Sequence, residues 1–101
     1  MSAMELTSAQ RRYLKQLAHP LKPLLQMGKE GPSAQFMRNM IEHLDNHELI
    51  KVRILNNCMA TREDITAAFE NAEVTVVQKV GHNYTVFKQK EEDSQLSLPR
   101  K

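Results

Sequence analysis

The chain has 101 residues, of which 41% are hydrophobic and 26% are charged, which is enough for one compact domain and too few for two. The formal net charge of +2 at pH 7 does not by itself indicate a nucleic-acid-binding protein, but residues 1–29 carry five basic residues and one acidic residue, against nine and eleven in the remainder. The single cysteine, Cys58, excludes an intrachain disulfide and a four-thiolate metal site. No segment has the roughly 18 to 20 consecutive apolar residues of a membrane span. We therefore expect a cytoplasmic protein.

A helix that starts at Thr7 is the first predicted element. Thr7 and Gln10 have the spacing of a capping box, in which each side chain bonds a free backbone N–H. Apolar residues of this helix recur at three- and four-residue steps, at Leu14, Leu17, Ala18 and Leu21. Pro20 disfavours helical geometry in the residue before it, so the helix ends near His19. The short apolar run 24–27 then predicts a buried strand.

The second helix shows the clearest periodicity, and Pro32 suits its first helical position. Its apolar face comprises Phe36, Met37, Met40, Ile41 and Leu44. From Glu48 the period changes to two, which predicts a strand with Lys51 and Arg53 on one side. The apolar residues on the other side of this strand are Ile50, Val52 and Ile54. Thr61 then resembles another helix start, leading to the apolar positions Ile65, Ala68, Phe69 and Ala72.

The last two strands, over 74–80 and 84–86, flank a hairpin turn at 81–83. The resulting order, α-β-α-β-α-β-β, predicts an α/β fold with two right-handed parallel crossovers and a final antiparallel pair. Val77 and Phe87 have the opposite parity to their apolar neighbours, so we expect the first helix to cover the second face of the sheet and make three layers. We take residues 1–88 as one domain and residues 89–101 as a polar tail.

A four-residue loop, Gly28-Lys29-Glu30-Gly31, lies between the predicted first strand and the second helix. Its glycines permit positive φ angles and close approach of a ligand backbone, and the helix that follows presents N–H groups with partial positive charge. A phosphodiester backbone fits such a site, as in KH domains, although glycines at this spacing also mark ordinary turns. The other candidate RNA-binding side chains come from the basic first third and are Arg11, Arg12, Lys15 and Lys22.

Three segments in order resemble the CRM domain family (chloroplast RNA splicing and ribosome maturation) in its small, stand-alone bacterial YhbY-like form. They are LAHPLKP, GKEG and HELIKV, and the resemblance runs from about Leu6 to Phe87 and includes the terminal LSLPRK. It implies an RNA-binding domain with a mixed four-stranded sheet and three helices, similar to the C-terminal domain of bacterial translation initiation factor three. It also implies that residues 28–31 and a basic first helix around Lys15 contact RNA. Stand-alone bacterial members are associated with precursors of the large ribosomal subunit.

The residues and the resemblance together predict a monomeric RNA-binding protein that contacts ribosomal RNA in precursors of the large subunit and assists ribosome assembly. We expect no cofactor and no membrane partner. The sequence leaves one alternative open, a protein-interaction adaptor on the ribosome. In that case the basic residues would only aid solubility, and the tail or an exposed sheet edge would make the contact.

An enzymatic or metal-binding function has little support in the sequence. His43 and His47 are four residues apart, a spacing that can place two imidazoles on one helix face, but no third ligand has a recognisable spacing. Cys58 has no evident base beside it in the sequence that could activate it as a nucleophile. We therefore expect neither catalytic residues nor metal ligands.

Overall fold

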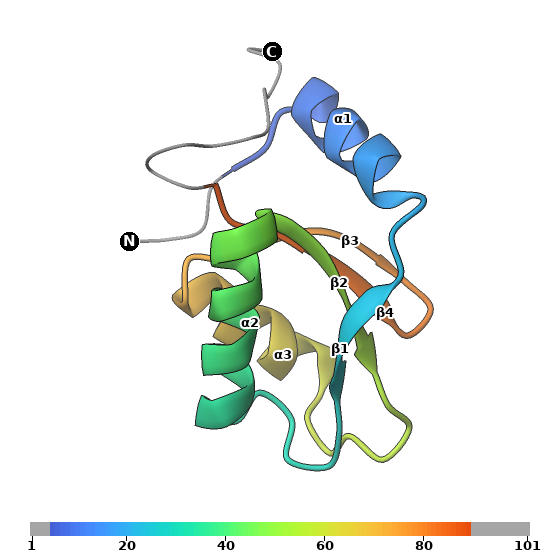
Figure 1. Cartoon of the computed structure of the whole chain (residues 1–101). Helices are drawn as coiled ribbons and strands as arrows, with labels where there is room; N and C mark the ends of the chain where they lie inside the picture. The colour runs from blue at the N-terminus through green and yellow to red at the C-terminus, as the bar shows by residue number, and fades with distance from the viewer. Residues whose placement is uncertain (1–4, 90–101) are drawn as a thin grey trace.

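The computed structural model describes residues 5–89, which form three helices and four strands (Figure 1). The helices are α1 (Ser8–Ala18), α2 (Ala34–His47) and α3 (Arg62–Asn71), and the strands are β1 (Pro23–Met27), β2 (Leu49–Ile54), β3 (Thr75–Val80) and β4 (Asn83–Phe87). Their order along the chain is the predicted one, and the α/β class is confirmed. The predicted tail lies outside the described residues apart from Gln89.

The four strands form one mixed sheet in the order β1-β2-β4-β3. β1 pairs with β2 in parallel, whereas β4 pairs antiparallel with both β2 and β3. Both β2 and β3 therefore run in the same direction, and α2 and α3 form two parallel crossovers, as predicted. The two edges of the sheet are β1 and β3.

The main core lies between one face of the sheet and the helices α2 and α3. Phe69 of α3 is fully buried, and its ring meets that of Tyr84 on β4 edge-on, with 5.7 Å between ring centroids. The other buried residues of this core are Met27, Met40, Leu44, Ile50, Val52, Ile54, Ile65, Val74 and Val86. The predicted apolar positions of β2 all point into this core, which leaves Lys51 and Arg53 on the opposite face of the sheet.

The helix α1 covers part of that opposite face. Leu14 and Ala18 pack against Leu49, Val77 and Phe87 in a second, smaller core. Figure 1 shows α1 separated by the sheet from α2 and α3. Val77 faces this side because neighbouring residues of a strand alternate between its faces, and Val76 packs against the main core. The prediction of three layers is confirmed.

Three polar caps begin the helices. Thr7 and Gln10 form the predicted capping box, and Thr61 accepts a hydrogen bond from the backbone N–H of Asp64 at 3.0 Å. The predicted start of α2 is wrong. Ser33, not Pro32, precedes the first turn, because the Ser33 hydroxyl accepts a hydrogen bond from the Phe36 N–H at 3.1 Å.

The prediction of a buried first strand is also wrong. Only Met27 of β1 is fully buried, and Leu24 is 50% exposed, because β1 lies at the edge of the sheet. The apolar stripe of α1 is narrower than the sequence indicates. Leu17 remains more than one third exposed, because α1 covers only one end of the sheet face, and Leu21, which is equally exposed, lies beyond the end of α1 at Ala18.

Candidate nucleic-acid interface

The loop 28–31 follows β1 directly and closes as a tight turn. The Gly31 N–H donates to the Gly28 carbonyl at 3.0 Å, and the Ser33 N–H donates to the Gly31 carbonyl at 2.8 Å. Lys29 and Glu30 occupy the exposed tip of the turn. The loop therefore presents one cation and one anion to solvent, just before the amino end of α2.

The two glycines of the loop have different structural roles. Gly31 is buried at a φ of +64°, and a Cβ there would lie 3.0 Å from the Cβ of Ala60. A Cβ at Gly28 would meet only ordinary contacts, at 3.9 Å from Leu55 Cδ1 and 4.0 Å from Asn57 Oδ1. Gly31 is thus required by the turn itself, whereas Gly28 is the position at which a small side chain would change the surface and leave the fold intact.

The basic residues of α1 fall into two groups. Arg12 and Lys15 are exposed. The Arg11 guanidinium instead donates hydrogen bonds to the backbone carbonyls of Val76 and Val77 at the β3 bulge. Arg11 therefore ties α1 to an edge strand as well as adding positive charge, a role that its place in the sequence does not reveal.

The loop and α1 lie at opposite ends of β1 (Figure 1). Lys22 immediately precedes β1 and Gly28 immediately follows it. Six residue steps, at about 3.3 Å each, separate Lys22 from Gly28 by roughly 20 Å. The expected cations of α1 therefore do not flank the loop directly, and one ligand must extend along the strand to contact both.

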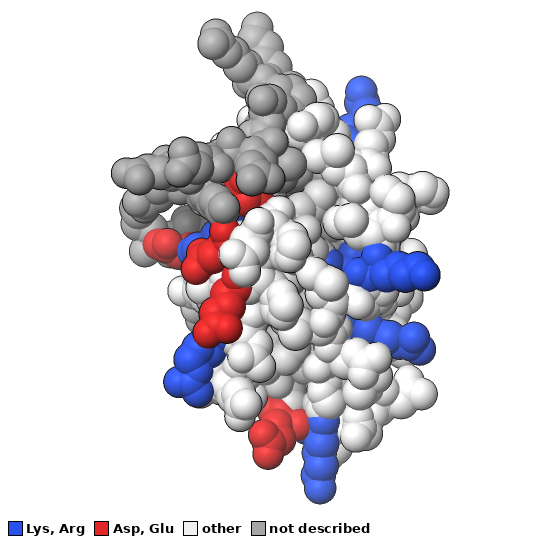
Figure 2. Space-filling model, in the orientation of Figure 1, with Lys and Arg blue, Asp and Glu red and all other residues white. Residues whose placement is uncertain are grey.

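Charge divides between the two faces of the sheet. The loop residues Lys29 and Glu30 and the buried Glu48 between α2 and β2 lie on neither face in this comparison. Of the other described residues, six basic and one acidic lie on the α1 side: Arg11, Arg12, Lys15, Lys22, Lys51 and Arg53, with Glu5. The side formed by α2, α3 and the turn after α3 carries six acidic and four basic residues: Glu42, Asp45, Glu63, Asp64, Glu70 and Glu73, with Arg38, Arg62, Lys79 and Lys88. Figure 2 shows basic side chains along the side of the molecule where β1 lies and acidic ones towards α2.

Two basic residues of the α1 side, Lys51 and Arg53, were absent from the sites expected from the sequence. Their alternation in β2 placed them away from the core, but only the sheet order shows that they lie beside β1 and on the same face as α1. Arg53 is exposed and Lys51 is partly exposed.

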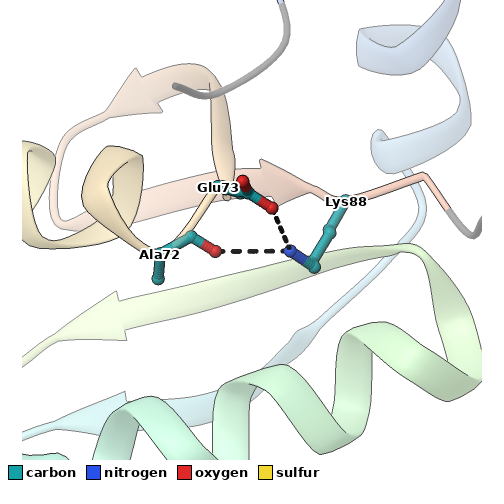
Figure 3. Close-up of polar contacts among 3 residues, drawn as sticks. All are labelled: Ala72, Glu73 and Lys88. Atoms are coloured by element: carbon teal, nitrogen blue, oxygen red, sulfur yellow. Dashed lines mark hydrogen bonds and ion pairs between the residues drawn. The ribbon is translucent and has the colours of Figure 1, made fainter. Parts of the chain in front are cut away.

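Lys88, which follows β4, belongs to the other side of the sheet. Its Nζ donates to the Ala72 carbonyl at 3.3 Å and lies 3.7 Å from Glu73 Oε2 (Figure 3). This cation thus ties the end of β4 to the turn after α3. It is already paired within the fold, unlike the lysines of the α1 side.

The histidine pair and the cysteine have structural surroundings. The rings of His43 and His47 stack with 6.4 Å between centroids, and Cys58 packs against the main core near Gly31. No group of three or more His, Cys, Asp or Glu side chains within residues 5–89 is placed to hold a metal ion. The helices of this part of the chain are also too short or too polar to cross a bilayer.

Comparison with known proteins identifies relatives over almost the full chain. "Probable RNA-binding protein YqeI" from Bacillus subtilis is 35% identical over 95 residues, covering 93% of this chain and 99% of that protein. An "RNA-binding protein" from Haemophilus influenzae is 32% identical over 97 residues, covering 95% and 97%. Both relatives are named for RNA binding, and neither name denotes an enzyme.

A solved structure shares the fold. The solution structure of a hypothetical protein from Staphylococcus aureus superposes with a TM-score of 0.72 at 31% identity, covering 94% of this chain and all of that one. The family model for the CRS1 / YhbY (CRM) domain matches residues 6–88, which include α1, the loop 28–31 and the whole sheet. The chain belongs to the CRS1 / YhbY (CRM) domain family.

Proposed function

We propose that this protein binds ribosomal RNA in precursors of the large ribosomal subunit and assists assembly of that subunit, as a cytoplasmic monomer. The contacts come from the loop 28–31, chiefly its backbone and Lys29, and from the basic residues of α1 and the segment after it. The observation that carries the proposal is the excess of positive charge on the α1 side of the sheet.

The charge and exposure of this surface favour recognition of the RNA backbone. Lys15 and Lys29 are exposed, and within residues 5–89 neither side chain takes part in an ion pair or a side-chain hydrogen bond. Such cations neutralise phosphates and release counterions, which supplies affinity without reading bases. Tyr13 is the aromatic residue of α1, and it packs in part against the second core, so stacking on bases contributes little. Family membership and the names of the relatives agree with RNA as the ligand.

The first test measures binding of the purified protein to large-subunit ribosomal RNA, transcribed in vitro, over a series of salt concentrations. The variant K15A/K29A removes two exposed cations. Each lost phosphate contact lowers the slope of log K against log salt concentration by roughly 0.7 to 0.9. The matched control, R38A/K79A, removes two cations from the α2 and α3 side and leaves the slope unchanged.

The second test follows the protein in cells. We expect crosslinking and sequencing to recover large-subunit ribosomal RNA, and density gradients to place the protein with precursor particles. Association with particles that persists in K15A/K29A, without RNA crosslinks, would instead support an adaptor that contacts ribosomal proteins.

A further inference from the structure

Beyond α1, none of the described helices covers the sheet face that leads to the loop 28–31, where Arg53 is exposed and Lys51 is partly exposed. α1 covers the end of the face at Leu49, Val77 and Phe87, while the loop lies at the far end of β1. A ligand that contacts both must cross at least the length of β1, roughly 20 Å from Lys22 to Gly28. The residues of β1 and β2 on this part of the face determine what can cross it.

Lys51 and Arg53 occupy this gap. In the parallel pairing of β1 and β2, Lys51 lies opposite Pro23, at the α1 end, and Arg53 lies opposite Gln26, near the loop. The Leu55 N–H then donates to the Met27 carbonyl at 2.9 Å, so β2 reaches the same end of the sheet as the loop. Leu49, Lys51 and Arg53 thus form a line from the edge of α1 towards Gly28.

The spacing of these two side chains and their lack of ion-pair partners suit a phosphate backbone. Residues two apart on a strand lie on one face with about 6.6 Å between their Cα atoms, which is close to the separation of successive phosphates in a nucleic-acid strand. Among residues 5–89, neither Lys51 nor Arg53 forms an ion pair or a side-chain hydrogen bond. The described acidic side chains nearest this track are Glu5, which precedes α1, and Glu30 at the tip of the loop. Neither β1 nor β2 carries an acidic residue between them.

We infer that RNA runs across the open half of the sheet, with its phosphates on Lys51 and Arg53, and so links α1 to the loop 28–31 in one continuous binding track. This inference rests on the proposed RNA-binding function and extends it to a surface outside the loop and α1. The exposed residues of β1 beside this track, Leu24 and Gln26, offer no charge that would repel RNA. An acidic protein partner would suit the same cations, and RNA binding that is unchanged when both charges are removed would favour it.

The experiment compares three double variants with the wild-type protein in binding to in vitro transcribed large-subunit ribosomal RNA over a salt series. K51Q/R53Q removes the two charges of the track, K51R/R53K retains them, and R38Q/K79Q removes two charges from the other side of the sheet. Circular dichroism and thermal unfolding of each variant confirm that the sheet is intact.

We expect K51Q/R53Q to lower the salt slope by about 1.4 to 1.8 and to weaken binding roughly tenfold per lost contact at 50 mM salt, as the slope implies. K51R/R53K and R38Q/K79Q should bind within about twofold of the wild-type protein. Wild-type binding that K15A/K29A weakens and K51Q/R53Q does not would overturn the inference and leave the proposed function standing. A wild-type protein that does not bind the RNA would overturn both.

Discussion

Substitutions at the two glycines of the loop test which glycine the fold requires and which one serves only the proposed RNA-binding site. Gly31→Ala places a Cβ on a backbone with φ of +64° and 3.0 Å from the Cβ of Ala60. The left-handed conformation costs a residue with a Cβ roughly 1 to 2 kcal/mol. Reduced freedom of the unfolded chain returns about 0.4 to 1 kcal/mol, and the displacement of Ala60 adds to the cost. We therefore expect a net loss of about 1 to 2 kcal/mol in the free energy of unfolding.

Gly28→Ala is the matched control, because its Cβ would meet Leu55 and Asn57 at ordinary contact distances. We expect its free energy of unfolding to lie within about 0.5 kcal/mol of the wild-type value. The chain has no Trp, so unfolding in urea is best followed by far-ultraviolet circular dichroism. In a thermal scan, each kcal/mol lost corresponds to a fall in Tm of roughly 4 to 8 °C.

Substitution of Gly28 by a larger residue is also expected to affect RNA binding. A bulkier substitution, Gly28→Val, should weaken RNA binding more than it weakens the fold, because a side chain there meets an approaching phosphate backbone. Equal unfolding midpoints for Gly31→Ala and the wild-type protein would refute the argument from backbone strain. Loss of stability in Gly28→Ala would show that Gly28 also serves the turn.

Two further predictions concern the attachment of α1. Arg11→Ala removes hydrogen bonds to the Val76 and Val77 carbonyls and should lower the free energy of unfolding in urea by about 1.5 to 3 kcal/mol. The control Arg12→Ala, at an exposed neighbour, should change it by less than about 0.5 kcal/mol. Equal effects of the two substitutions would mean that the Arg11 contact contributes little. Phe87→Ala removes a fully buried ring from the second core and should lower the free energy of unfolding by about 3 to 5 kcal/mol. In this variant, amide hydrogen exchange should show α1 losing protection before α2. Uniform loss of protection would contradict an independent second core.

Much of the fold follows from patterns that are local in the sequence. The pairing of Thr7 with Gln10 and the change of period at Glu48 each depend on residues within a turn or two, so they mark the ends and faces of elements directly. The parity of Val77 and Phe87 likewise predicted a covered second face, and α1 covers it. The predicted start of α2 was wrong because Pro32 and Ser33 both suit a helix start. The Ser33 hydroxyl accepts a hydrogen bond from the Phe36 N–H, so Ser33 caps the helix.

By itself, the sequence determined which segments form helices and strands and which loop bears the glycines, because those features depend on nearby residues. Only the tertiary structure decided that β1 lies at an edge, that Arg11 bonds to the β3 bulge, and that β2 carries Lys51 and Arg53 between α1 and the loop. These facts depend on pairings between residues far apart in the chain. No local propensity encodes such pairings, because their free energy is released only when the sheet assembles.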